Sequence, residues 1–305
     1  MPKDLHELPK LRDSISYLYI EHAVIEQDDA SIVLIQKDGK TPVPISSLTC
    51  LLLGPGTSIT HAAVRAAAEN GCMLIWCGEA IGRFYASGMG ETRSADNLLL
   101  QAKLCMDPEA HLSVVRKMYE IRFPSVPTKG LTLQQIRGME GVRVKQTYRV
   151  ESKRTGVKWS ARNYRQAEWD TTDDINRALS AANAILYSVC HAAIVSLGYS
   201  PGLGFVHTGK MLSFVYDIAD LYKTEITIPA AFEAVRDQKG DLDQRIRLYT
   251  RRKIVNTGIL KRVAVDIARV FDVPLQEEQQ NRTEVGEIWD ENGLLPGGVN
   301  YDGGR

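Results

Sequence analysis

The sequence lacks a net charge, a paired-cysteine spacing and a long apolar run. Its 305 residues include 37 Lys or Arg and 37 Asp or Glu, so the overall charge favours no class of partner. Five cysteines without any C-x-x-C pair support neither a zinc ribbon nor a disulfide framework. No apolar run approaches the roughly 18 residues of a membrane span, and the charged start MPKDLHELPK has no signal-peptide core. We therefore expect a reduced, cytoplasmic protein without membrane contact.

The composition is that of a globular protein, with 44% hydrophobic and 24% charged residues, and its pattern changes near residue 90. Residues 1–88 alternate short apolar runs with turn residues, which predicts a small β-rich N-terminal domain with one helix. Residues 97–273 have helical periodicity and predict an all-α domain. A Gly- and Ser-containing linker at 87–96 joins them, and residues 274–305 are predicted to be a flexible acidic tail. The predicted fold class is therefore α+β.

Turn residues and helix-capping residues locate individual elements. A hairpin turn is expected at Asp38-Gly39, and Asp107-Pro108 predicts a break between two helices. Thr132 and Gln135 form a capping-box pattern, and Asp173 is expected to start a helix that ends near Leu197. Strands are predicted for SISYLYI, SIVLIQK, LTCLLLG, CMLIWC and GRFYAS.

Basic residues are concentrated in two stretches although the whole chain is neutral. Residues 112–165 contain 13 Lys or Arg and three acids, and residues 244–262 contain seven basic residues and no acid. Such stretches indicate a surface for a polyanion such as DNA. The alternative is a set of solvated helix faces whose charges pair with acids elsewhere.

The stretch FVHTGKMLSFVYDIAD, residues 205–220, has the densest set of reactive side chains. Ser213 is expected to cap a helix on which Asp217 and Asp220 lie three residues apart, beside an apolar stripe. Two neighbouring carboxylates repel each other unless a cation or a proton lies between them. With His207, they resemble half of a metal site. The apolar stripe consists of Phe214, Ile218 and Leu221.

The other half is predicted at Glu140, which lies between Gly138 and Gly141 in a helical pattern. Each glycine inside a helix costs about 1 kcal/mol relative to alanine, so we expect close approach of a helix, a metal or a phosphate backbone there. Carboxylates with one imidazole suit Mg²⁺ or Mn²⁺ better than zinc. The alternative is a pair of buried ion pairs with Arg137 or Lys210.

A polar seam also follows the apolar stripe of the helix that begins near Asp173. It suits a helix that lines a site, and it suits hydrogen bonding between helices equally well. The seam consists of Asn176, Ser180, Asn183, Tyr187 and His191.

Several motifs together resemble the catalytic subunit of the CRISPR spacer-acquisition integrase, in the branch found with type I-E (Cascade) systems. They are RGMEG around Glu140, GFVHTGK with His207, and SFVYDIAD with Asp217 and Asp220. PGTSITHAAVRAAA, FYASG, QAKL and VVRKMYEIRF extend the likeness over nearly the whole chain up to about residue 270.

The resemblance implies a site and a set of partners. Glu140, His207 and Asp220 take the positions of the metal ligands, and Asp217 takes that of an accompanying acid. The implied partners are prespacer DNA with single-stranded 3′ ends, CRISPR repeat DNA, and a dimer of a small partner subunit flanked by two homodimers of this chain. Residues near the cleft or the single-stranded end are Lys210, Tyr216, Tyr187, Tyr164 and Trp169; further DNA contacts are Arg83, Arg247 and Lys223.

Two positions depart from the family pattern. Relatives have a tyrosine that caps the end of the duplex, where this chain has His22, and an imidazole stacks on a base less well than a phenol ring. We keep His22 as a candidate DNA contact, assisted by Tyr19. The family pattern has a basic residue after PGT, where this chain has Ser58. This difference removes one phosphate contact.

The implied reaction is a transesterification in which the 3′-hydroxyl of the prespacer attacks a phosphodiester at the repeat boundary. The same site is expected to cut 3′ overhangs with water as the nucleophile. Lys210 is expected to neutralise phosphate charge, and Asp217 either completes a second metal position or orients His207. The alternatives are a non-catalytic DNA-binding scaffold of the same complex and a metallohydrolase that acts on a small molecule.

Overall fold

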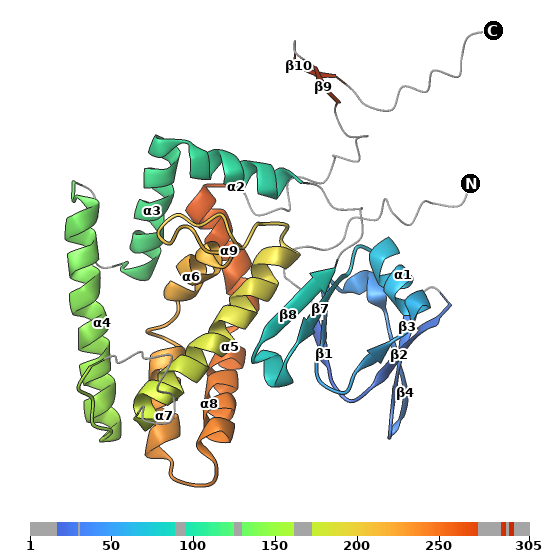
Figure 1. Cartoon of the computed structure of the whole chain (residues 1–305), viewed down its shortest axis with the longest axis horizontal. Coiled ribbons are helices and arrows are strands. Elements are labelled where there is room, and N and C mark those ends of the chain that lie inside the picture. Colours follow the sequence, from blue (N-terminus) through green and yellow to red (C-terminus); the bar gives the residue numbers. More distant parts are fainter. Residues whose placement is uncertain are drawn as a thin grey trace.

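A small β domain is followed by a helical domain in the computed structural model, which confirms the predicted α+β fold (Figure 1). All five cysteines are free. The structure describes residues 17–29, 31–88, 95–124, 130–161, 173–273, 288–290 and 293–295.

The β domain consists of two four-stranded sheets. One has the order β1-β5-β7-β8, made of Tyr17–Ile20, Cys50–Leu53, Met73–Cys77 and Phe84–Gly88. The other has the order β4-β3-β2-β6, made of Gly39–Val43, Ser31–Gln36, Val24–Asp28 and Ser58–Ile59. The predicted hairpin is confirmed, because Gln36 pairs with Gly39 and Gly39 has a positive φ that favours glycine. Helix α1 (His61–Glu69) begins after Thr60, whose hydroxyl accepts a hydrogen bond from the N–H of Ala63.

Strand β5 is an uninterrupted apolar run because the sheet is covered on both of its faces. Leu51 and Leu53 belong to the core that α1 closes. Cys50 and Leu52 point to the other face, where they meet Ala192 of α5 (Asp174–Ser196). A strand that is buried on both sides needs apolar residues at every position. The helical domain therefore packs directly on the first sheet.

Two of the predicted caps are confirmed, and so is the predicted helix break. Thr132 and Gln135 form the capping box of α4, Asp173 caps α5, and α2 and α3 are separated at Asp107, which caps α3. Ser213 was expected to cap α6, but the N-cap is Leu212, because the Ser213 hydroxyl donates to the carbonyl of Lys210 at 2.8 Å. The other helices are α2 (Asp96–Met106), α3 (Pro108–Arg122), α4 (Leu133–Thr155), α6 (Ser213–Asp220), α7 (Thr227–Arg236), α8 (Leu242–Thr257) and α9 (Ile259–Phe271).

Helix α5 is the central helix and contacts α6, α7, α8, α9 and the first sheet. Its length and composition would suffice to cross a membrane, but 67% of its most apolar window is buried, as in a core helix. Its polar seam divides between two roles. Tyr187 faces the candidate site, whereas His191 stacks on Phe84 of β8 with ring centroids 3.6 Å apart. Burial at this domain contact lowers the pKa of His191 to about 4.

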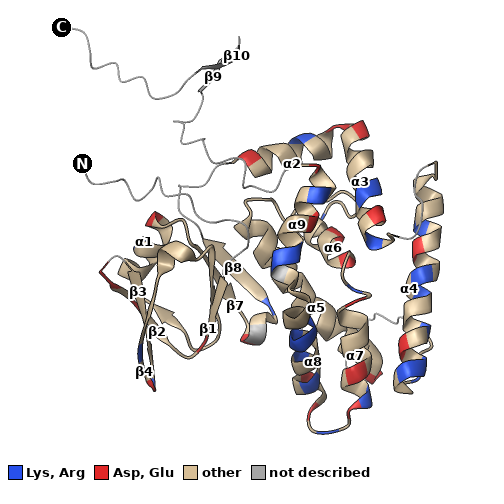
Figure 2. Ribbon diagram, turned by 180° about the vertical axis from the view of Figure 1, so that it is seen from behind, with Lys and Arg blue, Asp and Glu red and all other residues tan. Residues whose placement is uncertain are grey.

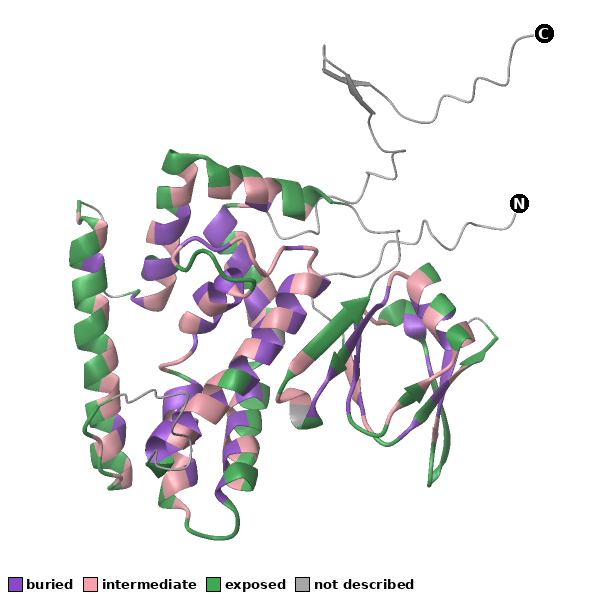
Figure 3. Cartoon of the chain, viewed as in Figure 1, coloured by how far each residue is buried: buried purple, intermediate pink, exposed green. Residues whose placement is uncertain are grey.

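Helix α4 lies at the edge of the helical domain, and most of its surface is exposed (Figure 3). Among its buried residues is Ile136, which joins the main core. A Cβ built at Gly138 or Gly141 meets no described atom within 4 Å. The expected approach of another helix at these glycines is therefore wrong for the described part of the chain.

Near the C-terminus, two short strands form an antiparallel pair, β9 (Ile288–Asp290) and β10 (Gly293–Leu295), with Trp289 opposite Leu294. The rest of the predicted acidic tail and most of the predicted linker lie outside the described residues.

Gln101 of α2 holds the loop that leaves α5, and it gives a first test. Its fully buried amide donates to the carbonyls of Ser200 (3.0 Å) and Leu203 (2.9 Å) and accepts from the N–H of Ser200 (2.7 Å).

Gln101→Leu leaves three backbone groups unpaired, so the free energy of unfolding should fall by about 2–4 kcal/mol. Urea denaturation measures it. Gln134→Leu, on the exposed first turn of α4, is the control, and equal midpoints for the two variants would contradict this account.

Candidate active site

The loop between α5 and α6 carries His207 and is fixed from two sides. A Cβ at Gly204 would overlap the carbonyl oxygen of His207, so this close approach requires glycine. From the other side, the Cys105 thiol donates to the carbonyl of Gly204 at 3.6 Å. The Nε2 atom of His111 lies 2.8 Å from the carbonyl oxygen of Phe205. The loop is therefore held against the corner between α2 and α3.

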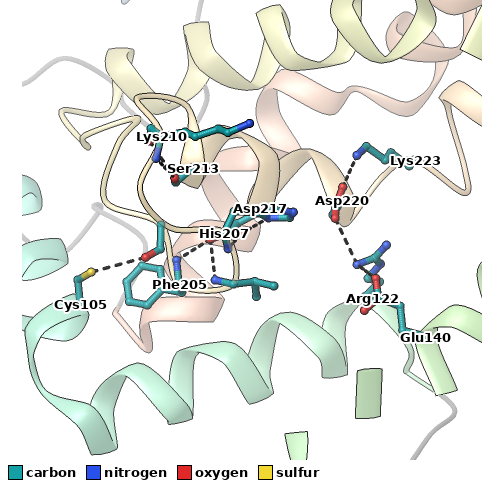
Figure 4. Close-up of polar contacts among 12 residues, drawn as sticks. Cys105, Arg122, Glu140, Phe205, His207, Lys210, Ser213, Asp217, Asp220 and Lys223 are labelled. Atoms are coloured by element: carbon teal, nitrogen blue, oxygen red, sulfur yellow. Dashed lines mark hydrogen bonds and ion pairs between the residues drawn. The ribbon is translucent and has the colours of Figure 1, made fainter. Parts of the chain in front are cut away.

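Asp217 organises the loop from within, because its buried carboxylate accepts four hydrogen bonds (Figure 4). The backbone N–H groups of Phe205 and Val206 donate to Oδ2 at 2.6 and 3.0 Å. The backbone N–H of His207 donates to Oδ1 at 2.8 Å, and its Nδ1 lies 2.7 Å from the same atom. Both oxygens are therefore already engaged, which favours the orienting role of Asp217 over a second metal position.

The same contact sets the charge of His207. The hydrogen bond with Asp217 raises the pKa of His207, burial opposes this, and the carboxylate of Asp220 adds to the increase. With Nδ1 directed at Asp217, Nε2 is the ring nitrogen left for a substrate proton or a cation. The His207 side chain is 44% exposed, so a substrate can reach it.

Glu140 and Asp220 meet at a single arginine, Arg122 of α3. Arg122 Nη1 forms a short ion pair with Glu140 Oε1 and lies 3.6 Å from Asp220 Oδ2 (Figure 4). The Nζ of Lys223 lies 2.5 Å from the other oxygen of Asp220. Burial lowers the pKa of Lys223, but the Asp220 carboxylate and Tyr187 outweigh burial, so the net pKa is raised.

This arrangement corrects two expectations. Asp217 and Asp220 do not share one cation, because Asp217 turns toward the loop and Asp220 turns toward Arg122 and Lys223. The ion pairs that we weighed as an alternative are present, but their basic partners are not Arg137 and Lys210. Among the described residues, no group of three or more His, Cys, Asp and Glu side chains converges enough to hold a metal ion. The set of metal ligands stays a prediction.

Aromatic rings connect the two parts of the site. Tyr216 packs edge-on against His207 and Tyr187, with centroids 5.8 and 5.0 Å apart. The Nζ of Lys223 lies 5.0 Å from the centre of the Tyr187 ring. The structure thus brings Tyr187, Tyr216 and Lys223 together beside His207 and Asp220.

Other predicted residues lie apart from this cluster. Lys210 is exposed in the loop and forms no ion pair with the described residues. Arg83 lies between η3 (Glu79–Ile81) and β8, where Glu79 also lies 3.8 Å from Arg247 of α8. His22 is exposed in the turn after β1 and has a positive φ of 52°. Tyr164 and Trp169 lie outside the described residues.

Sequence reasoning missed Arg122. It was one of the 13 basic residues in its stretch, and nothing in the local pattern distinguished it from the others. The one signal for it was the repulsion expected between the acids, which predicts a cation beside them. That signal does not identify which basic residue supplies the charge. Gln101 and His111 were missed for a similar reason, since their partners are about a hundred residues away.

The residues present fit a hard divalent cation by their chemistry. Glu140 and Asp220 offer carboxylate oxygens and His207 offers an imidazole, the mixture that suits Mg²⁺ or Mn²⁺. Arg122 shows that positive charge is accommodated between the two carboxylates. Lys223 and the neighbouring tyrosines add a positive charge and aromatic surface, which suit a phosphodiester and its bases.

The fold and site define a class of protein with a β domain, a helical domain and a site made of carboxylates, histidine and lysine. The family model for "CRISPR associated protein Cas1" matches residues 16–126 and 120–248. A Thermus thermophilus relative, "CRISPR-associated endonuclease Cas1 2", is 48% identical over 99% of this chain and 94% of its own length. A relative of the same family from Escherichia coli K12 is 46% identical over 81% of each chain.

A solved structure, described as a TtCas1–DNA complex, superposes with a TM-score of 0.80 at 51% identity. The match covers 87% of this chain and 99% of that chain. The chain belongs to the Cas1 family of CRISPR-associated endonucleases. This confirms the resemblance at the level of the family.

The contact between His207 and Asp217 gives a test by pH. The pKa of His207 is raised in the folded state, so the contact with Asp217 stabilises the folded protein fully when the pH is below the unfolded-state pKa of about 6.5. This stabilisation is lost as the pH rises through the folded-state pKa of His207. His207→Gln should therefore cost more stability at about pH 5.5 than at about pH 8.5. Asp217→Asn should lower the pKa of His207, measured by an NMR titration of the imidazole.

The control is His61→Gln, at the exposed start of α1. If the cost of His207→Gln were equal at both pH values, the Asp217 contact would not set the charge of His207.

Proposed function

We propose that this chain is a metal-dependent DNA endonuclease and integrase of CRISPR adaptation. The observation that carries the proposal is the meeting of Glu140 and Asp220 at one cationic centre beside His207, on the fold of the Cas1 family. The names of its relatives support nuclease chemistry, and the structure of the TtCas1–DNA complex supports a DNA substrate.

The proposed reaction joins the 3′-hydroxyl of a prespacer to a phosphodiester at the repeat boundary, which breaks one ester bond as it forms another. Mg²⁺ or Mn²⁺, held by Glu140, His207 and Asp220, would supply Lewis-acid polarisation of the phosphodiester. Asp217 keeps the ring of His207 in one orientation. Lys223, and Lys210 from its exposed position in the loop, neutralise phosphate charge. Tyr187 and Tyr216 offer rings for unpaired bases.

The proposed DNA surface extends from the site along two helices. Lys and Arg residues are frequent along the ribbons of α8 and α4 (Figure 2). Helix α4 is mostly exposed, whereas α8 is exposed on one side, where it carries Arg251 and Arg252 beside the half-buried Arg247, without an acid after Asp243. Such a surface binds the phosphate backbone without preference for sequence, which suits an enzyme that accepts almost any prespacer.

We also propose the assembly that the family resemblance implies. In it, this chain forms a homodimer, and two homodimers flank a dimer of a small partner subunit on prespacer DNA. We further propose that this chain belongs to the branch of the family that accompanies type I-E systems. A non-catalytic DNA scaffold is the second candidate function, since the two acids are ion-paired to protein cations in this structure.

Substitution of the acids tests the chemistry directly. Glu140→Ala or Asp220→Ala should reduce strand transfer at least about a thousandfold, because each removes a proposed ligand of the cation. DNA binding should survive both changes. The measurement is half-site integration of a labelled prespacer into a supercoiled repeat plasmid, with the partner subunit, in Mn²⁺ and with EDTA.

Glu225→Ala is the matched control, because Glu225 pairs with Arg262 on the surface. Activity of the Asp220→Ala protein in Mn²⁺ would show that the site is misassigned. Activity that resists EDTA would favour chemistry without a divalent cation.

The dependence of binding on salt tests the surface. Changing Arg247, Arg251 and Arg252 together to alanine should weaken binding of a prespacer duplex and reduce the slope of log affinity against log salt by about one per lost phosphate contact. Lys37→Ala, in the exposed turn between β3 and β4, is the control. Affinity that does not change with salt would instead indicate a small-molecule substrate.

A further inference from the structure

Four charged side chains form a cluster at the candidate site. Two are carboxylates, Glu140 and Asp220, and two are cations, Arg122 and Lys223. All are more than three-quarters covered, with side-chain exposures of 20% and 17% for the acids and 10% and 23% for the cations. The formal charges of the cluster sum to zero, so each carboxylate already has a cationic partner.

Arg122, like Asp220, keeps a buried polar atom that has no hydrogen-bond partner among the described residues. Arg122 approaches each acid through the same nitrogen, Nη1, so one N–H group is shared between two carboxylates. Its Nε is buried and has no hydrogen-bond partner among the described residues. A buried donor without a partner is costly, so this position of the arginine is less favourable than a paired one.

A divalent cation would therefore meet an occupied site. If it bound to Glu140 and Asp220 while Arg122 and Lys223 stayed, four positive charges would face two negative ones at close range. Arginine cannot lose its proton under ordinary conditions, so Arg122 can relieve this excess only by moving away. It is attached to the last turn of α3, and the phosphates of a bound DNA are acceptors that suit its fork.

We propose that Arg122 is the resident counter-cation of this site and competes with the divalent cation for Glu140 and Asp220. It holds the two carboxylates together in the metal-free protein, and DNA that accepts the guanidinium favours binding of the cation. Arg122 thereby couples DNA binding to metal binding. The proposal rests on the metal-dependent function proposed above, and it assigns Arg122 a positioning role.

The test is a titration with Mn²⁺, in which free Mn²⁺ is measured by electron paramagnetic resonance on the full chain without DNA. Arg122→Met and Arg122→Gln both remove the charge, and glutamine keeps a head that can hydrogen-bond to the acids. Both variants should bind Mn²⁺ at least about tenfold more tightly than the unchanged protein. Lys117→Met is the matched control, because Lys117 lies on the same helix but pairs with Asp272.

Thermal unfolding gives a second readout that is independent of activity. Without metal, both Arg122 variants should unfold at a lower temperature, since two buried carboxylates lose a cation. Saturating Mn²⁺ should raise their unfolding temperature by more than that of the unchanged protein. Adding a duplex that ends in 3′-deoxy nucleotides should tighten Mn²⁺ binding more in the unchanged protein than in the variants.

Equal or weaker Mn²⁺ binding by both Arg122 variants would overturn the proposal, provided that Glu140→Ala abolishes binding and so places the ion at this site. If neither the unchanged protein nor the variants bind Mn²⁺, the metal site of the proposed function fails, and the competition fails with it.

Discussion

The buried carboxylate of Asp217 is the constraint on which the site depends. An isolated charge in such a position would cost several kcal/mol, and it is tolerated because four donors surround it. Three of these donors are consecutive backbone N–H groups, so satisfying the charge also fixes the conformation of residues 205–207. The position of His207 is therefore a consequence of satisfying one buried acid.

Helix α5 links this local order to the rest of the molecule. One part of it carries Tyr187 toward the site, and another places Ala192 and His191 against the first sheet. Because these contacts lie on one rigid, mostly buried helix, the β domain and the site are connected through packed side chains. Gln101 and His111 extend the support by attaching the loop to α2 and α3.

The acidic half of the site is built by a different principle. Glu140 comes from α4, a mostly exposed helix, and its carboxylate contacts Arg122 and Tyr119 of α3. The His207 half is thus fixed by backbone hydrogen bonds, whereas the Glu140 half is fixed by charge. Contacts of the second kind respond to ions and polyanions, which suits the DNA surface proposed above.

The sequence alone determined the elements whose signals are local. The helix break at Asp107, the caps at Thr132 and Asp173, the hairpin at Gly39 and strand β5 follow from propensities within a few residues. The same locality made Glu140, His207, Asp217 and Asp220 visible as candidates, since each lies in a short motif.

Tertiary structure alone decided the partners of these residues. That Asp217 faces the loop, that Asp220 faces Arg122 and Lys223, and that no described helix approaches Gly138 and Gly141 depend on the relative placement of distant segments. A charged side chain needs an opposite charge nearby, and a neutral chain with 37 residues of each sign offers many. Only the tertiary structure brings Arg122 of α3 to Glu140 of α4 and Asp220 of α6.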